Sequence, residues 1–382
     1  MEKPHFKTTC VHAGNLEDSV HKGSISPLYM ATSYAFEEVE INQYPRYFNT
    51  PNQRGLCQKI AALEGAETGL IFGSGMAAIS TTLLSHLKPG DHVIFQNDLY
   101  GGTRNFIKKE LSKLHIEYSF TEGLSVAHFK EAKRPNTQGI YVETPSNPTL
   151  KLIDLAQLAK WAKQEGLWTM IDNTFASPVN QNPIALGIDL VLHSATKYLG
   201  GHSDICAGAV VGNKASVERI FEVAKNLGGS LSDATVWLLE RSIKTLYLRV
   251  GAQNANALGL AQFLESQAWV SHVYYPGLAS HPQHALAVQQ MKGFGGMLSF
   301  ELDHKISASQ FLKNLKLIKP SMSLAGVEST ALSPRLTSHA LLTEEERLAQ
   351  GITPQLIRFS CGIEALEDLQ EDLAQAVRNS KK

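Results

Sequence analysis

Between residues 53 and about 215, short segments that are apolar at every position alternate with segments that are apolar on one face only. A strand that is apolar throughout is buried on both faces, which is typical of a parallel sheet covered by helices. The expected strands are 69–72, 92–96, 116–120, 139–143, 167–172, 188–193 and 207–212. This alternation predicts an α/β fold with a mostly parallel sheet and helices on both faces.

The segments between these strands carry signals for helices. Residues 53–64 repeat their leucine and isoleucine side chains at helical spacing. A second helix is expected directly after Gly73–Met76, and the sequence "KPGD" ends it. Asp154 is suited to cap a third helix, because a side-chain carboxylate accepts hydrogen bonds from the free N–H groups of a first turn.

The chain divides into three parts that differ in composition and in the periodicity of their apolar residues. Residues 1–52 show no periodicity and are punctuated by Pro, Asn and Tyr, so we expect an arm that docks on its own domain or on a neighbouring subunit. Residues 53–235 form the α/β domain. One long or broken helix then opens a smaller α+β domain over 236–382, with a closing helix from about 366 to 377.

Composition excludes several classes of function. Hydrophobic residues make up 43% of the 382 positions, which is enough to bury a sizeable core. A formal net charge of −1, with Lys and Arg scattered, argues against nucleic-acid or membrane partners. Without an apolar run for a signal peptide or a span, we expect a cytoplasmic protein. Four distant cysteines predict neither a disulfide framework nor a metal site.

Ligands bind beyond the carboxyl ends of the strands in sheets of this kind, so the residues after each strand deserve inspection first. Gly73-Ser74-Gly75-Met76 joins a strand to a helix, and free N–H groups at a helix N-terminus bind phosphate. An ordinary strand-to-helix turn explains the same residues. Tyr100, before Gly101-Gly102, is suited to stack on a flat ligand, although a packed loop tyrosine fits equally.

Two further strands end in polar residues. Asn147-Pro148 is a turn pair, and Asn147 can also hydrogen-bond a polar ligand group. Asp172 ends a buried apolar strand, where a carboxylate needs a partner such as a protonated ring nitrogen. Capping of the next turn is the alternative role for Asp172.

The segment "HSATKYLGGHSD" places Lys197 one residue after Thr196 and three after Ser194. The two hydroxyls can face one side and bind phosphate, and a desolvated lysine amine beside them would have a lowered pKa. A neutral amine forms Schiff bases with carbonyls. A surface lysine is the plain alternative. The coincidence of all these residues at one sheet edge instead predicts a site for pyridoxal phosphate (PLP).

The motifs, in their order, resemble the transsulfuration (Cys/Met metabolism) family of PLP-dependent enzymes. The family includes cystathionine γ-lyase, cystathionine β-lyase, cystathionine γ-synthase, methionine γ-lyase and O-acylhomoserine sulfhydrylases. The matching segments are "YPRYFN", "GSGMAA", "YGGT", "ETPSNPT", "IDNTFASP", "HSATKYLGGHSD", "SLAGVES" and "IRFSCGIE". The resemblance implies the PLP-dependent transferase fold type I, which is aspartate aminotransferase-like. It also implies a homotetramer of two dimers, with active sites at the dimer interface.

The resemblance assigns roles to individual residues. Catalysis falls to Lys197 as Schiff-base lysine and proton shuttle, to Asp172 at the pyridinium nitrogen, and to Tyr100 over the ring. The implied cofactor-binding residues are Lys197, Asp172, Gly75, Met76, Ser194, Thr196, Tyr100, Tyr44, Arg46 and Asn147. Tyr44 and Arg46 would reach the phosphate of the neighbouring subunit. Arg358 would grip the substrate α-carboxylate, with Ser323 and Asn147.

Three positions depart from the family pattern. The chain reads Asn49-Thr50-Pro51 where Asn-Pro-Thr is usual, which affects the path of the arm. Gly102 stands where methionine γ-lyases typically have cysteine. Met322 replaces the glutamate that several γ-lyases and synthases carry, which removes an acidic contact for a distal ammonium.

The resemblance therefore implies a carbon–sulfur lyase that acts on cystathionine or related sulfur amino acids by α,β- or α,γ-elimination. The alternatives are γ-replacement, as in cystathionine γ-synthase or O-acylhomoserine sulfhydrylase, and methionine γ-lyase, which Gly102 disfavours. Two other classes compete: a cofactor-free Schiff-base enzyme such as an aldolase, and a cofactor-binding protein without catalysis. The first leaves the phosphate loop and Asp172 unexplained, and the second does not require Lys197 or Arg358.

Overall fold

The computed structural model describes residues 4–37, 39–340 and 342–380. A seven-stranded sheet with helices around it forms the larger part, and a five-stranded sheet lies beside α10 (Leu246–Glu265) and α14 (Leu366–Arg378). The predicted arm starts at residue 1 and the predicted C-terminal domain ends at 382, so the outer ends of both lie outside the described residues. The division of the chain into an arm and two domains stays a prediction.

The larger sheet is mostly parallel, as expected. Its strand order is β1-β7-β6-β5-β4-β2-β3, and every neighbouring pair from β6 to β3 is parallel. Strand β7 runs antiparallel to both β6 and β1, so β1 points the same way as β6. The strands are β1 (Thr68–Phe72), β2 (His92–Phe95), β3 (Glu117–Phe120), β4 (Thr137–Glu143), β5 (Trp168–Asp172), β6 (Leu190–His193) and β7 (Gly208–Gly212). All except β7 therefore end at one edge.

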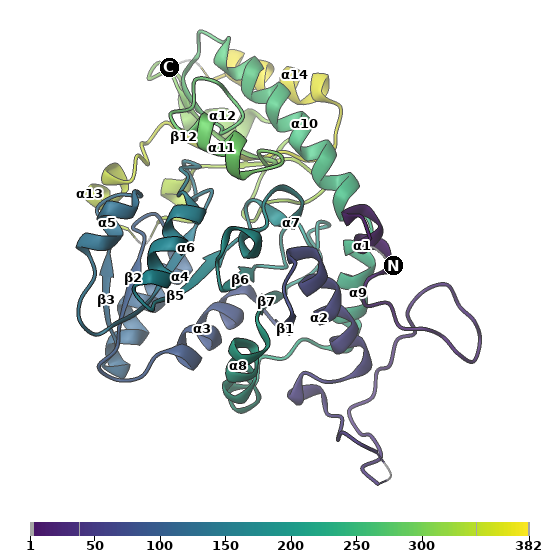
Figure 1. Ribbon diagram of the computed structural model, residues 1–382. Coiled ribbons are helices and arrows are strands. Elements are labelled where there is room, and N and C mark those ends of the chain that lie inside the picture. The colour runs from purple at the N-terminus through teal and green to yellow at the C-terminus, as the bar shows by residue number, and fades with distance from the viewer. Residues whose placement is uncertain (1–3, 38, 341, 381–382) are drawn as a thin grey trace.

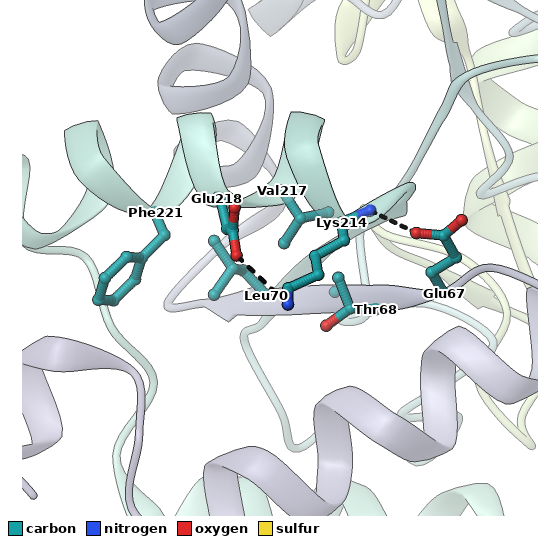
Figure 2. Close-up of a pocket in the computed structure, with 8 residues that line it drawn as sticks. Glu67, Thr68, Leu70, Lys214, Val217, Glu218 and Phe221 are labelled. Atoms are coloured by element: carbon teal, nitrogen blue, oxygen red, sulfur yellow. Dashed lines mark hydrogen bonds and ion pairs between the residues drawn. The ribbon is translucent and has the colours of Figure 1, made fainter. Parts of the chain in front are cut away.

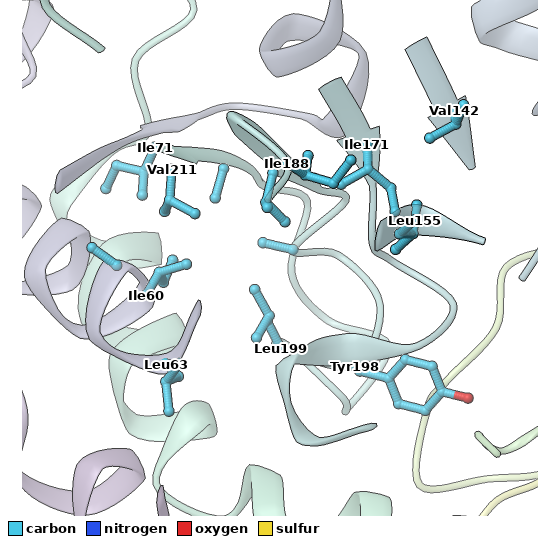
Figure 3. Packing of buried hydrophobic residues seen from close by; sticks show 14 of the residues in the cluster. Ile60, Leu63, Ile71, Val142, Leu155, Ile171, Ile188, Tyr198, Leu199 and Val211 are labelled. Atoms are coloured by element: carbon cyan, nitrogen blue, oxygen red, sulfur yellow. The ribbon is translucent and has the colours of Figure 1, made fainter. Parts of the chain in front are cut away.

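Alternate side chains of these strands enter two separate cores, which explains why the strands are apolar at every position. On one face, Ile71 and Val211 pack against α2 (Pro51–Glu64), and Ile171 packs near Leu155 of α6 (Leu155–Gln164), as Figure 3 shows. Their chain neighbours Leu70 and Val210 pack on the opposite face against α3 and α8. A sheet covered on both faces has no polar side, and the sequence pattern follows from that.

The helices around the larger sheet begin and end with recognisable caps. Thr50 and Gln53 form a reciprocal capping box at the start of α2, and Asp154 accepts a hydrogen bond from the Gln157 N–H at the start of α6. The helices of this part are α2 (Pro51–Glu64), α3 (Gly75–His86), α4 (Gly101–Phe106), a π-helical turn (Ile107–Leu111), α5 (Val126–Glu131), α6 (Leu155–Gln164), α7 (Ser177–Asn180), α8 (Lys214–Leu227) and α9 (Asp233–Ile243). The three predicted helices are confirmed.

The Asn49-Thr50-Pro51 departure has a local physical reason. Thr50 is the cap of α2 and also donates to the Asp233 carboxylate, while Pro51 occupies the first helical position, where a missing N–H costs nothing. Asn49 accepts a hydrogen bond from the Tyr44 backbone N–H. The altered order therefore gives α2 a well-formed start.

The smaller sheet has the order β10-β11-β12-β9-β8 and a core of its own. Its strands are β8 (Val270–Tyr274), β9 (Met297–Leu302), β10 (Lys319–Pro320), β11 (Thr330–Leu332) and β12 (Leu356–Ser360). The remaining helices here are α11 (His284–Gln290), α12 (Ala308–Asn314) and α13 (Glu344–Ala349). The helix expected over 234–266 is broken between α9 and α10 at Lys244–Thr245.

The N-terminal segment is only partly irregular, which corrects the expectation. Residues Phe6–His12 form α1, where Thr9 and Cys10 are buried against the rest of the chain. Beyond α1 the segment runs outward as the purple loops of Figure 1. Large apolar side chains are exposed along it: Val20, Ile25, Leu28, Tyr29, Met30, Phe36, Val39, Ile41, Tyr44 and Tyr47.

All four cysteines have free thiols, and three of them are buried. The described residues contain no cluster of His, Cys, Asp and Glu suited to a metal ion. Within the same residues, no helix is long and apolar enough to cross a membrane.

Candidate active site

The candidate site lies where the parallel strands end, because chain direction brings the residues after β1, β2, β4, β5 and β6 to one edge of the sheet. Strand β12 of the smaller sheet adds Arg358 from the other side. Hydrogen bonds join four of the predicted residues there: Lys197, Ser323, Arg358 and Asn147.

Helix α3 supplies the predicted phosphate site. Ser74 caps the helix by accepting a hydrogen bond from the Ala77 N–H, which leaves the Gly75 and Met76 N–H groups without an intrahelical acceptor. A Cβ on Gly75 would lie only 2.8 Å from the Ser194 Cβ. Glycine at position 75 therefore lets the helix N-terminus touch the end of β6, beside the Ser194 hydroxyl.

Lys197 is held by one flexible contact. Its Nζ donates a 2.7 Å hydrogen bond to the Ser323 Oγ. Burial, and then the charge of Arg358, lower the pKa of Lys197 to about 8. A substantial fraction of the amine is therefore neutral near physiological pH, which is the form that attacks a carbonyl.

Arg358 is the buried cation of the site, with 5% of its surface exposed. Its Nη1 donates to the Asn147 Oδ1 at 3.2 Å, and its Nη2 donates to the Ser323 backbone oxygen at 2.9 Å. Burial lowers the pKa of Arg358 to about 10, so the guanidinium stays charged at neutral pH. The predicted carboxylate-binding set of Arg358, Ser323 and Asn147 is thus one hydrogen-bonded group.

The Asp172 side chain caps the turn that follows β5, and its carboxylate is still suited to pair with a cation. Its Oδ1 accepts a hydrogen bond from the Thr174 N–H at 3.0 Å. Burial raises the pKa of Asp172, against hydrogen bonds from Thr174 and the charges of His193 and Lys197, which lower it. A carboxylate that burial disfavours in this way gains stability from a protonated ring nitrogen.

Tyr100 lies at the rim, with 44% of its surface exposed. Its backbone N–H donates to the Glu143 Oε2 at 2.9 Å, and its ring packs over Gly102. A Cβ on Gly102 would approach the ring to 2.6 Å, so a cysteine there would require Tyr100 to move. The observed position of the Tyr100 ring therefore requires glycine at position 102.

Three predicted residues have other partners within the chain. The Thr196 hydroxyl donates to the Ala207 backbone oxygen and accepts from the Ala207 N–H, so its proton is already used. Arg46 donates to the Lys225 backbone oxygen at the end of α8, and its guanidinium lies over the rings of Tyr44 and Tyr47. No hydrogen bond in the described part of the chain joins Tyr44 or Arg46 to Lys197, Asp172 or Arg358.

Sequence reasoning missed three residues at this edge. Glu143 is buried at the end of β4 and its carboxylate accepts a hydrogen bond from the Tyr100 N–H; an acidic residue ending an apolar strand was the available signal. His339 is buried in the loop after β11, where burial and then Arg358 lower its pKa to about 4. Glu64, at the end of α2, pairs with His193. Nothing local in the sequence distinguishes His339 or Glu64.

Figure 2 shows a separate pocket at the far edge of the larger sheet. It measures about 310 Å³ and lies between β1 and α8, where Lys214 Nζ approaches the Glu218 carboxylate to 3.9 Å. None of the predicted site residues lines it. This pocket is therefore separate from the candidate active site.

The groups that meet at the strand ends fit PLP. A low-pKa amine, a buried carboxylate and a helix N-terminus opened by a glycine match the aldehyde, ring nitrogen and phosphate of that cofactor. An aldolase-type site without cofactor would use only the first of these.

Known proteins resemble the chain over nearly its whole length. Cystathionine γ-lyase from Bacillus subtilis (strain 168) is 44% identical over 377 residues, covering 98% of this chain and 99% of that protein. Cystathionine β-lyase from Lactococcus lactis subsp. cremoris (strain MG1363) is 43% identical, covering 97% of this chain and 98% of that protein. A crystal structure of cystathionine γ-lyase from Lactobacillus plantarum complexed with L-serine matches with a TM-score of 0.95 and 39% identity, over 99% of both chains.

The expected fold type I architecture is confirmed by this structural match. The family model for "Cys/Met metabolism PLP-dependent enzyme" matches residues 7–378, which include every predicted site residue. The chain therefore belongs to the Cys/Met metabolism family of PLP-dependent enzymes.

Proposed function

We propose that this chain is a lyase that breaks a carbon–sulfur bond in cystathionine or a related sulfur amino acid. The observation that carries the proposal is the chain of contacts from Lys197 through Ser323 to Arg358. It sets a proton-transferring amine beside a buried carboxylate-binding group, which is the arrangement that an α-amino acid requires.

Arg358 and Asn147 hold the substrate α-carboxylate. The guanidinium offers paired N–H donors in a fixed plane, and its burial excludes water that would weaken a carboxylate bond. Asn147 already accepts from Arg358, so its amide orients the guanidinium and leaves its own N–H₂ to donate. This fixes which face of the substrate's α carbon looks toward Lys197.

PLP supplies, when bound, an aldehyde that condenses with amines and a ring that accepts negative charge from the substrate α carbon. Lys197 then removes the α-proton, for which its low pKa suits it. Asp172 keeps a proton on the ring nitrogen. Gly75, Met76 and Ser194 hold the phosphate, while Thr196 orients the segment through Ala207. Tyr100 covers the ring.

The choice of leaving group follows from the relatives and from Met322. The similar proteins named above are a cystathionine γ-lyase and a cystathionine β-lyase, which supports elimination from a sulfur amino acid. Met322, next to Ser323, is 67% exposed and offers an apolar side chain where an acidic one would bind a distal ammonium. O-acylhomoserines carry no distal ammonium, so γ-replacement on such a substrate is the second candidate.

An assay panel separates these reactions. Purified holoenzyme would be incubated with cystathionine, methionine, cysteine and O-acylhomoserines, the last with and without cysteine or sulfide. The proposal expects oxo acid, ammonia and a thiol from cystathionine. Thioether formed from an O-acylhomoserine and a thiol, with cystathionine left intact, would establish γ-replacement instead.

The predicted N-terminal arm, residues 1–52, is proposed to complete the site of a second copy within a homotetramer. Ten large apolar side chains between Val20 and Tyr47 are exposed, which a lone chain would not favour. In this arrangement Tyr44 and Arg46 exchange their present partners for the neighbouring chain's phosphate.

Mixing two inactive variants tests the shared site. Co-refolded Arg46→Ala and Lys197→Ala chains at equal amounts should regain activity, because about a quarter of randomly formed sites receive both intact residues. Each variant alone provides the baseline. Activity that stays at this baseline, although the mixed oligomer forms, would show that Arg46 serves its own chain.

A further inference from the structure

Beneath the strand edge lies a buried polar network that none of the proposed steps uses. It centres on the Glu64 carboxylate at the end of α2, which has 1% of its surface exposed. The His193 Nε2 lies 2.6 Å from the Glu64 Oε1, and the Asn173 Nδ2 donates to the same oxygen at 2.8 Å. His193 and Asn173 are themselves buried, at 2% and 0% exposed.

These two contacts join the ends of two strands. Asn173 directly follows Asp172 at the end of β5, and His193 directly precedes Ser194 at the end of β6. One carboxylate from a third element thus ties the segment that presents Asp172 to the segment that presents Ser194, Thr196 and Lys197. We propose that Glu64 and His193 are positioning residues that fix the spacing and charge of the cofactor-binding groups.

The network also reaches a third strand end. Asn173 and Gln181 exchange hydrogen bonds, and the Gln181 Nε2 donates to the Thr144 backbone oxygen at 2.9 Å. Thr144 begins the loop that carries Asn147 after β4. The carboxyl ends of β4, β5 and β6 are therefore linked through side chains as well as through the sheet.

The electrostatic role follows from the surroundings of Asp172. Burial disfavours its ionised form, while Thr174 hydrogen bonds and the charges of His193 and Lys197 favour it. Burial, and then the nearby charge of Asp172, raise the pKa of both Tyr141 and Glu143. The His193 Nε2 lies 2.6 Å from the Glu64 Oε1, so the Glu64 carboxylate stabilises positive charge on the imidazole and, through it, the ionised form of Asp172.

This inference rests on the proposed roles of Asp172 and Lys197. The test compares holoenzymes carrying Glu64→Gln, which keeps the shape but removes the charge, and Glu240→Gln. Glu240 is a matched control, since it is also a buried glutamate paired with a cation, Lys244, but lies on α9. The readouts are the pH titration of the visible absorbance of lysine-bound PLP and the dissociation constant of PLP.

Loss of the Glu64 charge should leave Asp172 less ionised and the ring nitrogen less protonated. A less protonated ring withdraws fewer electrons, so the absorbance titration should move up by about 0.5 pH unit or more. PLP should dissociate about tenfold more readily. Glu240→Gln should match the wild type in both. A Glu64→Gln holoenzyme that also matches the wild type in both would overturn the inference.

A second variant keeps the test decisive if Glu64→Gln folds poorly. His193→Gln retains an amide donor toward Glu64 but removes the ring charge, so it should shift the absorbance titration in the same direction. An unshifted titration refutes the inference. Failure of the site assignment itself looks different, because Lys197→Ala would then keep the lysine-bound absorbance.

Discussion

Two lysines with the same lowered pKa lie in different regions of the molecule. Burial is the main cause in both, and each amine has a pKa of about 8. Lys59 joins α2 to the N-terminal segment, whereas Lys197 follows β6 at the strand edge. A low pKa alone would mark both as reactive.

Their partners distinguish them. The Lys59 Nζ donates to the Cys10 backbone oxygen at 3.2 Å and to the Asn15 Oδ1 at 3.1 Å, and its side chain is fully buried. The Lys197 Nζ contacts the hydroxyl of Ser323, on a loop, and is partly exposed. Lys59 donates to several oxygens inside the chain, while Lys197 has one side-chain partner to exchange for a ligand. The reactivity of each amine therefore depends on the hydrogen bonds that it must break to bind a ligand.

Replacing Lys197 should give the largest effect. Lys197→Ala removes the group that transfers the α-proton, so kcat should fall by about 10³-fold or more. Lys59→Met should stay within about twofold of the wild type, because Lys59 contacts no predicted site residue. Steady-state rates with cystathionine measure both. Comparable losses of kcat in the two variants would contradict the distinction between Lys197 and Lys59.

The second largest effect is expected at Arg358. Arg358→Lys keeps the charge but loses the paired N–H donors, so kcat/KM should fall by about 10- to 100-fold. Because the carboxylate is bound before and during the reaction, most of the loss should appear in KM. An unchanged KM would remove Arg358 from substrate binding.

Much of this arrangement could be predicted from sequence, and the failures have physical reasons. The strands were predictable because burial on both faces makes every position apolar, as in β6. The candidate residues that follow these strands could be grouped from the sequence, because parallel strands end at one edge, whereas Arg358 and Ser323 were named only through the family resemblance. The contact of Lys197 with Ser323 was not predictable, since 126 residues separate them. Helix α1 was missed because its burial depends on α2 and Lys59 rather than on its own periodicity.

The third effect concerns stability in the Lys59 region. Lys59→Met leaves the Cys10 and Asn15 oxygens without their buried donor, which should cost about 1–3 kcal/mol in the free energy of unfolding. The folded pKa of Lys59 is about 8, below its ordinary 10.5, so folding disfavours the protonated form. That penalty is complete below pH 8 and is relieved as pH rises toward 10.5.

Urea unfolding at several pH values measures this effect. The advantage of the wild type over Lys59→Met should grow between pH 7.5 and pH 9.5, since those values bracket the lower part of the titration. A constant difference across that range would mean that Lys59 does not titrate in the folded protein.

The smallest effect is a shift in a pH profile. PLP condenses with the neutral amine, so its recombination with the apoenzyme should speed up as pH rises through about 8 rather than 10.5. Arg358→Met removes the nearby charge that helps to lower the pKa of Lys197. The pH midpoint of PLP recombination should therefore be higher in this variant than in the wild type. Stopped-flow absorbance follows both. Equal midpoints would show that Arg358 does not act on Lys197.

Borohydride reduction of the holoenzyme, followed by peptide mapping, compares the two lysines in one experiment. Reduction fixes PLP to the lysine that holds it. The account predicts a single stoichiometric label on Lys197, in the segment His193–Asp204, and none on Lys59 despite its equal pKa. A label on Lys59, or a holoenzyme whose PLP cannot be fixed to Lys197, would contradict it.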